Sequence, residues 1–471
     1  MPEDASVWLA RAIAARQMQE MESALEAIGR AAALAPTDAQ VALGHAQLRF
    51  EAGLPATVLF QRAAALAPDR PEVQRSLALA MAAEGDAAGG EALLDAVVTA
   101  NPLWLDGHRA LANLRTAAGQ PDFARSLARA AAAHPGQPGL RHAWFHTLCT
   151  ARRWDEARQV LDQAEHDLGE SRATRLARAY WRSESGEGAN DPALFDLLED
   201  EQDTGLDLAR VRHFLRGGQV QRARDVALRH RGQPTMGVFW PYLSLAWRLL
   251  GDAQAHWLDR DMAFVCAYDV GLTAADLADL ATLLRTLHTA QAPWHEQSVR
   301  GGTQTERPLL LRLDPVIRKT RIAIEAVANR YIAALPPPDP QHPLLAAPRE
   351  QFLFAGSWSV RLRPNGFHAA HTHPMGWISS ALYVTVPPER QRGPAPAGHL
   401  QFGTPPPELG LALSSYGAVE PAPGTLALFP STMWHGTAPF ADGERMTIAF
   451  DVIPAAARRS PRSSGPAQSP R

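Results

Sequence analysis

The stretch LGHAQLRFEAGLPATVLFQRAAALAP, residues 43–68, predicts the architecture of the first half of the chain. Its apolar residues recur at helical spacing on both sides of Gly53, and Pro68 follows the second helical segment. A similar stretch, RALANLRTAAGQPDFARSLARAAAAHP, occupies residues 109–135. Each stretch predicts a helix, a glycine-marked turn, a second helix and a proline-marked turn. Because one helix pair cannot bury its apolar stripe alone, we expect several pairs to stack.

The turn residues repeat with a nearly constant period. The prolines are separated by 32, 34 and 33 residues and the glycines by 32 and 34; they are Pro36, Pro68, Pro102, Pro135 and Gly53, Gly85, Gly119. The pattern weakens after about residue 160, although Gly218 and Gly251 are again 33 residues apart. The period and its Leu-Gly, Ala and Pro positions resemble the tetratricopeptide repeat. This resemblance implies a helical repeat domain over residues 5–260 whose concave face binds a peptide or protein segment.

Length and composition narrow the class of protein. A chain of 471 residues exceeds one ordinary core, so two or three domains are expected. A net charge of −3 gives no reason to expect nucleic acid or an anionic membrane as the main partner. Two cysteines, Cys149 and Cys266, are too few for a disulfide framework. Since the sequence shows neither a secretory signal nor an apolar run of about 18 residues, we expect a cytoplasmic location.

The second half changes character at the proline-rich stretch PPPDPQHP, residues 336–343, which neither a helix nor a central strand can cross. Residues 270–335 still show amphipathic helical patterns. From Phe352 onwards, short stretches rich in β-branched and aromatic residues alternate with Pro/Gly clusters and predict strands. We therefore expect a multidomain protein: an all-α tetratricopeptide-like solenoid, then an α+β domain with a double-stranded β-helix (jelly-roll) core. The expected segments after the solenoid are a helical connector and N-terminal part of the second domain (261–345), the jelly roll (346–454) and a disordered tail (455–471).

A group of histidines in the β-rich half predicts a metal site. His371 and His373 are two residues apart and would share one side of a strand, and His435 comes from a distant strand. Imidazole suits zinc, copper, iron or nickel, but a structural zinc site needs a fourth protein ligand and no cysteine is nearby. Arg445 follows His435 by ten residues and offers a fixed cation to a bidentate anion. Iron with a dicarboxylate co-substrate explains both groups.

Three stretches carry a family resemblance: GSWSVRLRPNGFHAAHTHPMGWISSALYVTVP (356–387), PGTLALFPSTMWHGTAPF (423–440) and RMTIAFDV (445–452). They resemble the Fe(II)/2-oxoglutarate-dependent dioxygenases, in the branch related to prolyl hydroxylases that is often fused to tetratricopeptide repeats. The resemblance covers about residues 290–454 and implies Fe(II), 2-oxoglutarate and O2 as cofactor and co-substrates.

The resemblance also implies roles for individual residues. His371 takes the position of the first iron ligand and His435 that of the distal histidine. Arg445, assisted by Thr447, takes the position that binds the far carboxylate of 2-oxoglutarate. Tyr383 falls on the strand that supplies a tyrosine near the co-substrate, and an ordinary strand aromatic is the alternative.

His373 departs from the family pattern, which has Asp or Glu at this ligand position. We favour iron binding by His373, which would give a three-histidine site; the alternatives are a hydrogen bond to a partner beyond the metal, or a degenerate site. His368 is expected to face the other side of the strand, as a substrate-pocket or structural residue. The protein is thus expected to be an oxygenase that hydroxylates a peptide or protein presented by the repeats. The rival expectations are a three-histidine cupin-type dioxygenase without 2-oxoglutarate, and a repeat scaffold with a dead oxygenase domain.

Overall fold

The computed structural model describes residues 4–189, 191–259 and 261–458. The chain forms two compact units: unit 1 comprises residues 1–168, 286–295 and 305–321, and unit 2 comprises residues 169–285, 296–304 and 322–471. The predicted domain limits at residues 260, 345 and 454 remain predictions. Most of the predicted tail, from residue 459 onwards, lies outside the described residues, and Ala455–Arg458 forms a short 3-10 turn.

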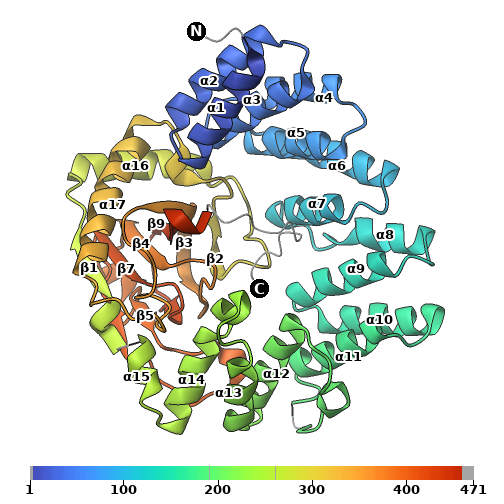
Figure 1. The fold of residues 1–471 in the computed structure, drawn as a ribbon, viewed down its shortest axis with the longest axis vertical. Helices are drawn as coiled ribbons and strands as arrows, with labels where there is room; N and C mark the ends of the chain where they lie inside the picture. The colour runs from blue at the N-terminus through green and yellow to red at the C-terminus, as the bar shows by residue number, and fades with distance from the viewer. Residues whose placement is uncertain (1–3, 190, 260, 459–471) are drawn as a thin grey trace. The chain divides into compact units, whose positions relative to one another are not determined.

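Unit 1 is built from consecutive helices that pack in pairs (Figure 1). The helices of unit 1 are α1 Ala5–Gln17, α2 Met21–Leu34, α3 Ala39–Glu51, α4 Thr57–Leu66, α5 Pro71–Ala83, α6 Ala87–Ala100, α7 Leu105–Ala117, α8 Arg125–Ala133, α9 Pro138–Thr150 and α10 Trp154–Leu168. Alanine is frequent in the cores between these helices, where Ala24, Ala31 and Ala80 have no exposed surface. Small side chains let the helices approach closely, which explains the alanine-rich composition of this half.

The predicted proline turns end the second helix of each pair. Pro36, Pro68, Pro102 and Pro135 each stand two residues after the last residue of α2, α4, α6 and α8. The residue before each proline is not helical, with φ between −128° and −139° and ψ between 63° and 67°. A following proline disfavours the helical conformation at that residue, so the helix must end there.

The turn after the first helix of each pair contains one residue with positive φ. These residues are Gln19, Gly53, Gly85, Gly119, Arg152, Gly186, Gly218 and Gly251, at separations of 34, 32, 34, 33, 34, 32 and 33. The repeat therefore continues to residue 251, which answers the question that the sequence left open after residue 160. The turns at Gln19 and Arg152 could not be recognised from the sequence, because this conformation is usually adopted by glycine.

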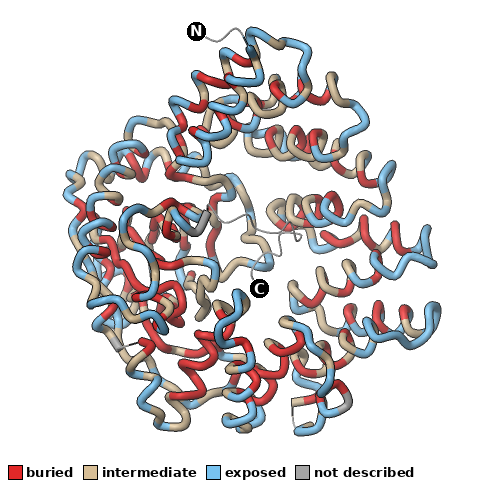
Figure 2. Tube along the Cα trace, viewed as in Figure 1, coloured by how far each residue is buried: buried red, intermediate tan, exposed pale blue. Residues whose placement is uncertain are grey.

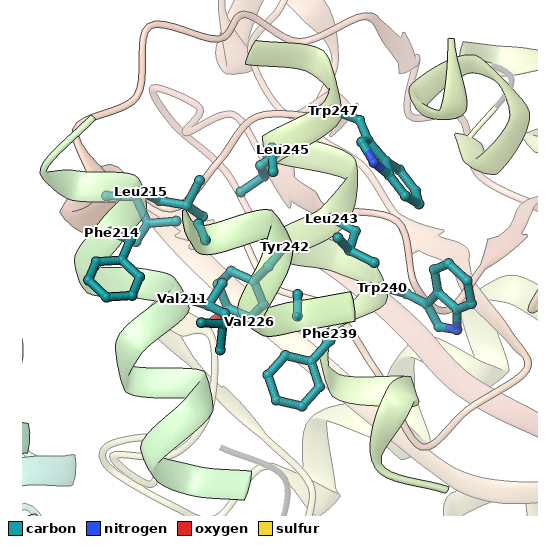
Figure 3. Packing of buried hydrophobic residues seen from close by; sticks show 14 of the residues in the cluster. Val211, Phe214, Leu215, Val226, Phe239, Trp240, Tyr242, Leu243, Leu245 and Trp247 are labelled. Carbon is teal, nitrogen blue, oxygen red and sulfur yellow. The ribbon is translucent and has the colours of Figure 1, made fainter. Parts of the chain in front are cut away.

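The later repeats belong to unit 2. Their helices are α11 Arg172–Ser185, α12 Thr204–Arg216, α13 Val220–Leu228, α14 Trp240–Leu250 and α15 Gln254–Asp259. After α11 the expected second helix is reduced to a 3-10 turn, Asp196–Leu198. Buried aromatic and aliphatic side chains of α12, α13 and α14 form one cluster (Figure 3). Leu409 and Trp434 also belong to this cluster. These helices therefore share a core with the β-rich part of the chain.

The β-rich part of unit 2 contains two antiparallel sheets. The larger has the order β1-β7-β4-β9-β3-β2 and the smaller β6-β5-β8. The strands are β1 Cys266–Asp269, β2 Val299–Gln304, β3 Phe352–His368, β4 Ile378–Thr385, β5 Leu400–Phe402, β6 Gly417–Val419, β7 Thr425–Pro430, β8 His435–Thr437 and β9 Arg445–Pro454. The central strands are buried (Figure 2), as β4 shows with only its last residue partly exposed. The predicted fold class, a tetratricopeptide-like solenoid followed by a jelly roll, is confirmed.

The segment between the repeats and the jelly roll differs from the helical expectation. It contains α16 Ala274–Leu287 and α17 Pro315–Ala334, but also strands β1 and β2 of the larger sheet. The sequence of β2, VRGGTQ, lacks strand periodicity because its glycines serve the backbone: Gly301 has φ +67°, and a Cβ on Gly302 would lie 2.3 Å from the Arg361 carbonyl oxygen. Among the described helices, none is long and apolar enough to cross a membrane.

Candidate iron and 2-oxoglutarate site

The three predicted histidines meet in unit 2. His371, His373 and His435 each place a ring nitrogen within 4.8 Å of the others. The backbones of His371 and His435 exchange two hydrogen bonds of 2.9 and 3.0 Å, and His373 N donates to Ser431 O at 2.9 Å. His371 and His435 form an isolated antiparallel β-bridge. His373 lies on the irregular connection before β4. The bridge to His435, rather than strand alternation, therefore brings the rings together.

Each ring is held through its Nδ1 atom. An oxygen acceptor lies at hydrogen-bond distance from all three: Ala369 O at 2.8 Å from His371, Met433 O at 3.0 Å from His435, and Asp451 Oδ2 at 2.7 Å from His373. Since carbonyl and carboxylate oxygens accept, Nδ1 carries the proton in each ring. In the neutral form of a ring held in this way the lone pair is on Nε2, the atom that can bind a metal.

The surroundings keep two of the rings neutral. Burial, with the neighbouring His373 as the second cause, lowers the pKa of His371 to about 3. Burial also lowers the pKa of His435 well below its ordinary value, with His371 and His373 as additional causes. A neutral imidazole is the form that binds a metal, so these two histidines are ready to bind one at neutral pH.

A buried arginine and tyrosine lie on the neighbouring strands. Arg445, at the start of β9, is 2% exposed, and its Cζ lies 5.0 Å from the centre of the Tyr383 ring on β4. Tyr383 pairs in register with Thr447, which is also buried. Among the described residues, Arg445 forms no ion pair with a carboxylate, and neither its Nε nor the Tyr383 hydroxyl has a hydrogen-bond partner. Because a buried guanidinium without a counterion is costly, this pair fits an anionic ligand.

Burial also shifts the pKa of both groups. It lowers the pKa of Arg445 and raises the pKa of Tyr383, and in each case the neighbouring group partly opposes the shift. The tyrosine hydroxyl therefore stays protonated and can donate to an anion, beside an arginine that is charged.

Several neighbours of the histidines were missed by sequence reasoning. Asp451 hydrogen-bonds to His373, and the Trp358 ring stacks on His373 with centroids 5.6 Å apart. His368 stacks on His371 at 5.7 Å, and the Ser298 hydroxyl lies 3.0 Å from His368 Nδ1. The expectation that His368 faces away was wrong, because the chain leaves regular strand geometry directly after this residue.

Comparison with known families identifies the β-rich part. The family model described as "Putative 2OG-Fe(II) oxygenase" matches residues 356–451. These residues form a 2OG-Fe(II) oxygenase domain. The matched segment contains all three histidines, Arg445, Thr447 and Tyr383. A comparison with curated proteins finds no match to the chain.

Solved structures of two kinds are similar to parts of the chain. A viral collagen prolyl hydroxylase from Paramecium Bursaria Chlorella virus-1 is 13% identical, covers 40% of this chain and 95% of its own, and has a TM-score of 0.28. A Pseudomonas putida prolyl-4-hydroxylase is 19% identical over 41% of this chain and 96% of its own, with a TM-score of 0.29. A tetratricopeptide repeat protein from Parabacteroides merdae is 13% identical over 51% and 98%, with a TM-score of 0.33.

The oxygenase domain is a 2-oxoglutarate-dependent non-haem iron enzyme, with Fe(II) as its metal and 2-oxoglutarate and O2 as co-substrates. The donor set fits this chemistry: imidazole nitrogens suit iron, and a planar buried guanidinium matches a carboxylate.

Proposed function

We propose that the protein is a hydroxylase that acts on a peptide or protein side chain. In this proposal His371, His373 and His435 hold Fe(II) through Nε2, and Arg445, Thr447 and Tyr383 hold 2-oxoglutarate. The observation that carries the proposal is the combination of three converging imidazoles with a buried guanidinium that forms no ion pair with a carboxylate of the described residues. When bound, iron and 2-oxoglutarate supply the oxidising chemistry, with O2 as oxidant and succinate and carbon dioxide as products.

The residues of this chain position these groups. The three Nδ1 hydrogen bonds restrict the ring orientations, which reduces the reorganisation needed when the metal binds. Arg445 neutralises one carboxylate of 2-oxoglutarate, and the Tyr383 hydroxyl is available to donate to an oxygen of the same ligand. Because Arg445, Thr447 and Tyr383 are all buried, water does not compete for these contacts.

The repeats support the peptide or protein part of the proposal. Stacked helix pairs form an extended surface, and solenoids of this kind use such surfaces to bind extended partners. Incubation with a peptide library, Fe(II), 2-oxoglutarate and O2 tests this part by mass spectrometry. Gain of one oxygen atom by a peptide, dependent on 2-oxoglutarate, is the expected result; oxidation confined to small molecules would contradict it.

The cofactor part is tested by adding Fe(II) and 2-oxoglutarate without O2. The wild type should develop a visible charge-transfer band, and His371→Ala and Arg445→Ala should lose it. Arg363→Ala is the matched control, because Arg363 is an exposed arginine of the same domain. A wild-type protein that is folded but gives no band would contradict the proposal.

Succinate measurement separates the alternatives. A cupin-type dioxygenase would consume O2 without forming succinate, and a dead domain would bind no iron although it is folded. Succinate formed in step with O2 consumption supports the proposed class.

A further inference from the structure

A buried carboxylate lies directly behind the histidine that replaces the usual carboxylate ligand. Asp451 Oδ2 accepts a hydrogen bond from His373 Nδ1 at 2.7 Å, although the residues are 78 positions apart in the chain. The Asp451 side chain is 12% exposed and that of His373 is 18% exposed. A hydrogen bond to an ionised carboxylate in such a place is about twice as strong as a neutral one.

Asp451 is itself fixed by hydrogen bonds and close packing. The Ser379 hydroxyl donates to Asp451 Oδ1 at 2.5 Å and lies 2.9 Å from the Ser431 hydroxyl. Ser379 and Asp451 also face each other in the β4–β9 register. A Cβ on Gly376 would lie 2.6 Å from Ser431 Oγ and 3.3 Å from Asp451 Cβ, so the chain passes here only without a side chain.

The other two histidines lack such a partner. Their Nδ1 atoms donate to the neutral carbonyl oxygens of Ala369 and Met433. Three neutral imidazoles would leave bound Fe(II) with one unit more positive charge than two imidazoles and one carboxylate. The carboxylate of Asp451, which is hydrogen-bonded to His373, is placed to compensate this additional positive charge.

From this arrangement we propose that Asp451 is a positioning residue for the metal: it fixes the tautomer and orientation of His373 and supplies, through that ring, the negative charge that a carboxylate ligand would supply directly. The inference rests on the proposed function, because it requires His373 to bind the metal. A carboxylate on the far nitrogen makes the imidazole a more basic ligand, which strengthens metal binding and favours the oxidised metal.

The experiment compares Asp451→Asn with Asp451→Ala in the full chain. The asparagine keeps an oxygen that can accept from His373 but removes the charge, whereas the alanine removes both. Asp442→Asn is the matched control, because Asp442 is an exposed aspartate of the same domain. Co(II) affinity and the Fe(III)/Fe(II) midpoint potential are measured for each variant, with circular dichroism as the check of folding.

We expect Asp451→Asn to weaken Co(II) binding about 10- to 100-fold and to raise the midpoint potential, with the control unchanged. A merely structural aspartate would not move the potential of a folded variant. If Asp451→Ala fails to fold, Asp451→Asn alone decides. Wild-type affinity and potential in folded Asp451→Asn, with the 2-oxoglutarate band intact in the wild type, would overturn this inference alone. Absence of that band in the wild type would remove the proposed function and, with it, this inference.

Discussion

At the scale of single residues, the proposal above has His373 and Asp451 together provide what one carboxylate ligand provides in a two-histidine, one-carboxylate site. His373 would supply the lone pair, and Asp451, whose Oδ2 lies 2.7 Å from His373 Nδ1, would supply the charge. A histidine at the ligand position therefore does not by itself make the site more positive, as long as the aspartate is present. The two residues should then behave as a unit when they are exchanged.

This coupling predicts the outcome of an exchange. His373→Asp alone would place a second carboxylate near Asp451, and repulsion between like charges would favour protonation of one of them. Addition of Asp451→Asn removes that repulsion and offers an amide donor to the new ligand. We expect the double variant to bind Fe(II) and 2-oxoglutarate about tenfold more tightly than His373→Asp alone, measured by anaerobic titration of the charge-transfer band. Effects that simply add would show that the two sites are independent.

A second prediction concerns the stability of the metal-free protein in acid. The pKa of His371 is about 3 in the folded state and 6.5 for an ordinary histidine, so between these values the unfolded chain binds more protons. The contribution of His371 to the free energy of unfolding is therefore fully present above about pH 6.5 and is lost as the pH falls towards 3. The expected loss is on the order of 1 kcal/mol per pH unit. Urea unfolding in the presence of a chelator measures the free energy of unfolding of the metal-free protein at several pH values. This free energy should depend less on pH in His371→Gln than in the wild type. An identical dependence would contradict the lowered pKa of His371.

The residues of the site were predictable to different degrees. His371, His435 and Arg445 stand out in the sequence because their spacing and strand context are unusual. Asp451 does not, because its partner is brought close only by the register of β9 with β4. A weak signal existed: Arg445, Thr447 and Asp451 alternate along β9, so they face the same side of the sheet as the site. The irregular chain around His373 has no such periodicity to read.

At the scale of elements, the repeat turns depend on residues with positive φ. Gly85 has φ +107° and an added Cβ would contact nothing within 4 Å, so only the backbone conformation opposes a side chain there. Gly85→Ala should therefore lower the free energy of unfolding by about 1 kcal/mol. Gly139→Ala is the control, because Gly139 lies in α9 and also has open space around it. This substitution should leave the free energy of unfolding unchanged or raise it slightly. Equal effects in thermal unfolding would contradict this explanation.

Whether an element could be predicted depends on whether its turn residues and apolar pattern are visible in the sequence. Among helices α1 to α10, those that end before a proline or at a glycine were predictable from these residues together with their apolar pattern. The turns at Gln19 and Arg152 were not, because a non-glycine residue occupies the left-handed region there. Strand β2 was missed because its two glycines allow close contact with a neighbouring backbone and do not produce an alternating apolar pattern.

At the scale of the whole molecule, repeat helices and oxygenase strands share one core in unit 2. The indole Nε1 of Trp434, next to the metal-site residue His435, donates to Pro241 O of α14 at 2.8 Å. The Tyr242 ring meets the Trp434 ring at 5.4 Å, edge to face. The last repeats are thus part of the support of the metal site, although the sequence pattern assigns them to the solenoid.

This shared core predicts which fragment can fold. A fragment of residues 261–458 lacks α11 to α15 and so uncovers the faces of Trp434 and Leu409 that these helices cover, which costs hydrophobic burial. We expect this fragment to be insoluble or to bind Co(II) far more weakly than a fragment of residues 169–458. Both fragments contain the segments 286–295 and 305–321 of unit 1, so these segments cannot cause the difference. If residues 261–458 fold and bind Co(II) with the affinity of the longer fragment, α11 to α15 are a separable module and do not support the metal site.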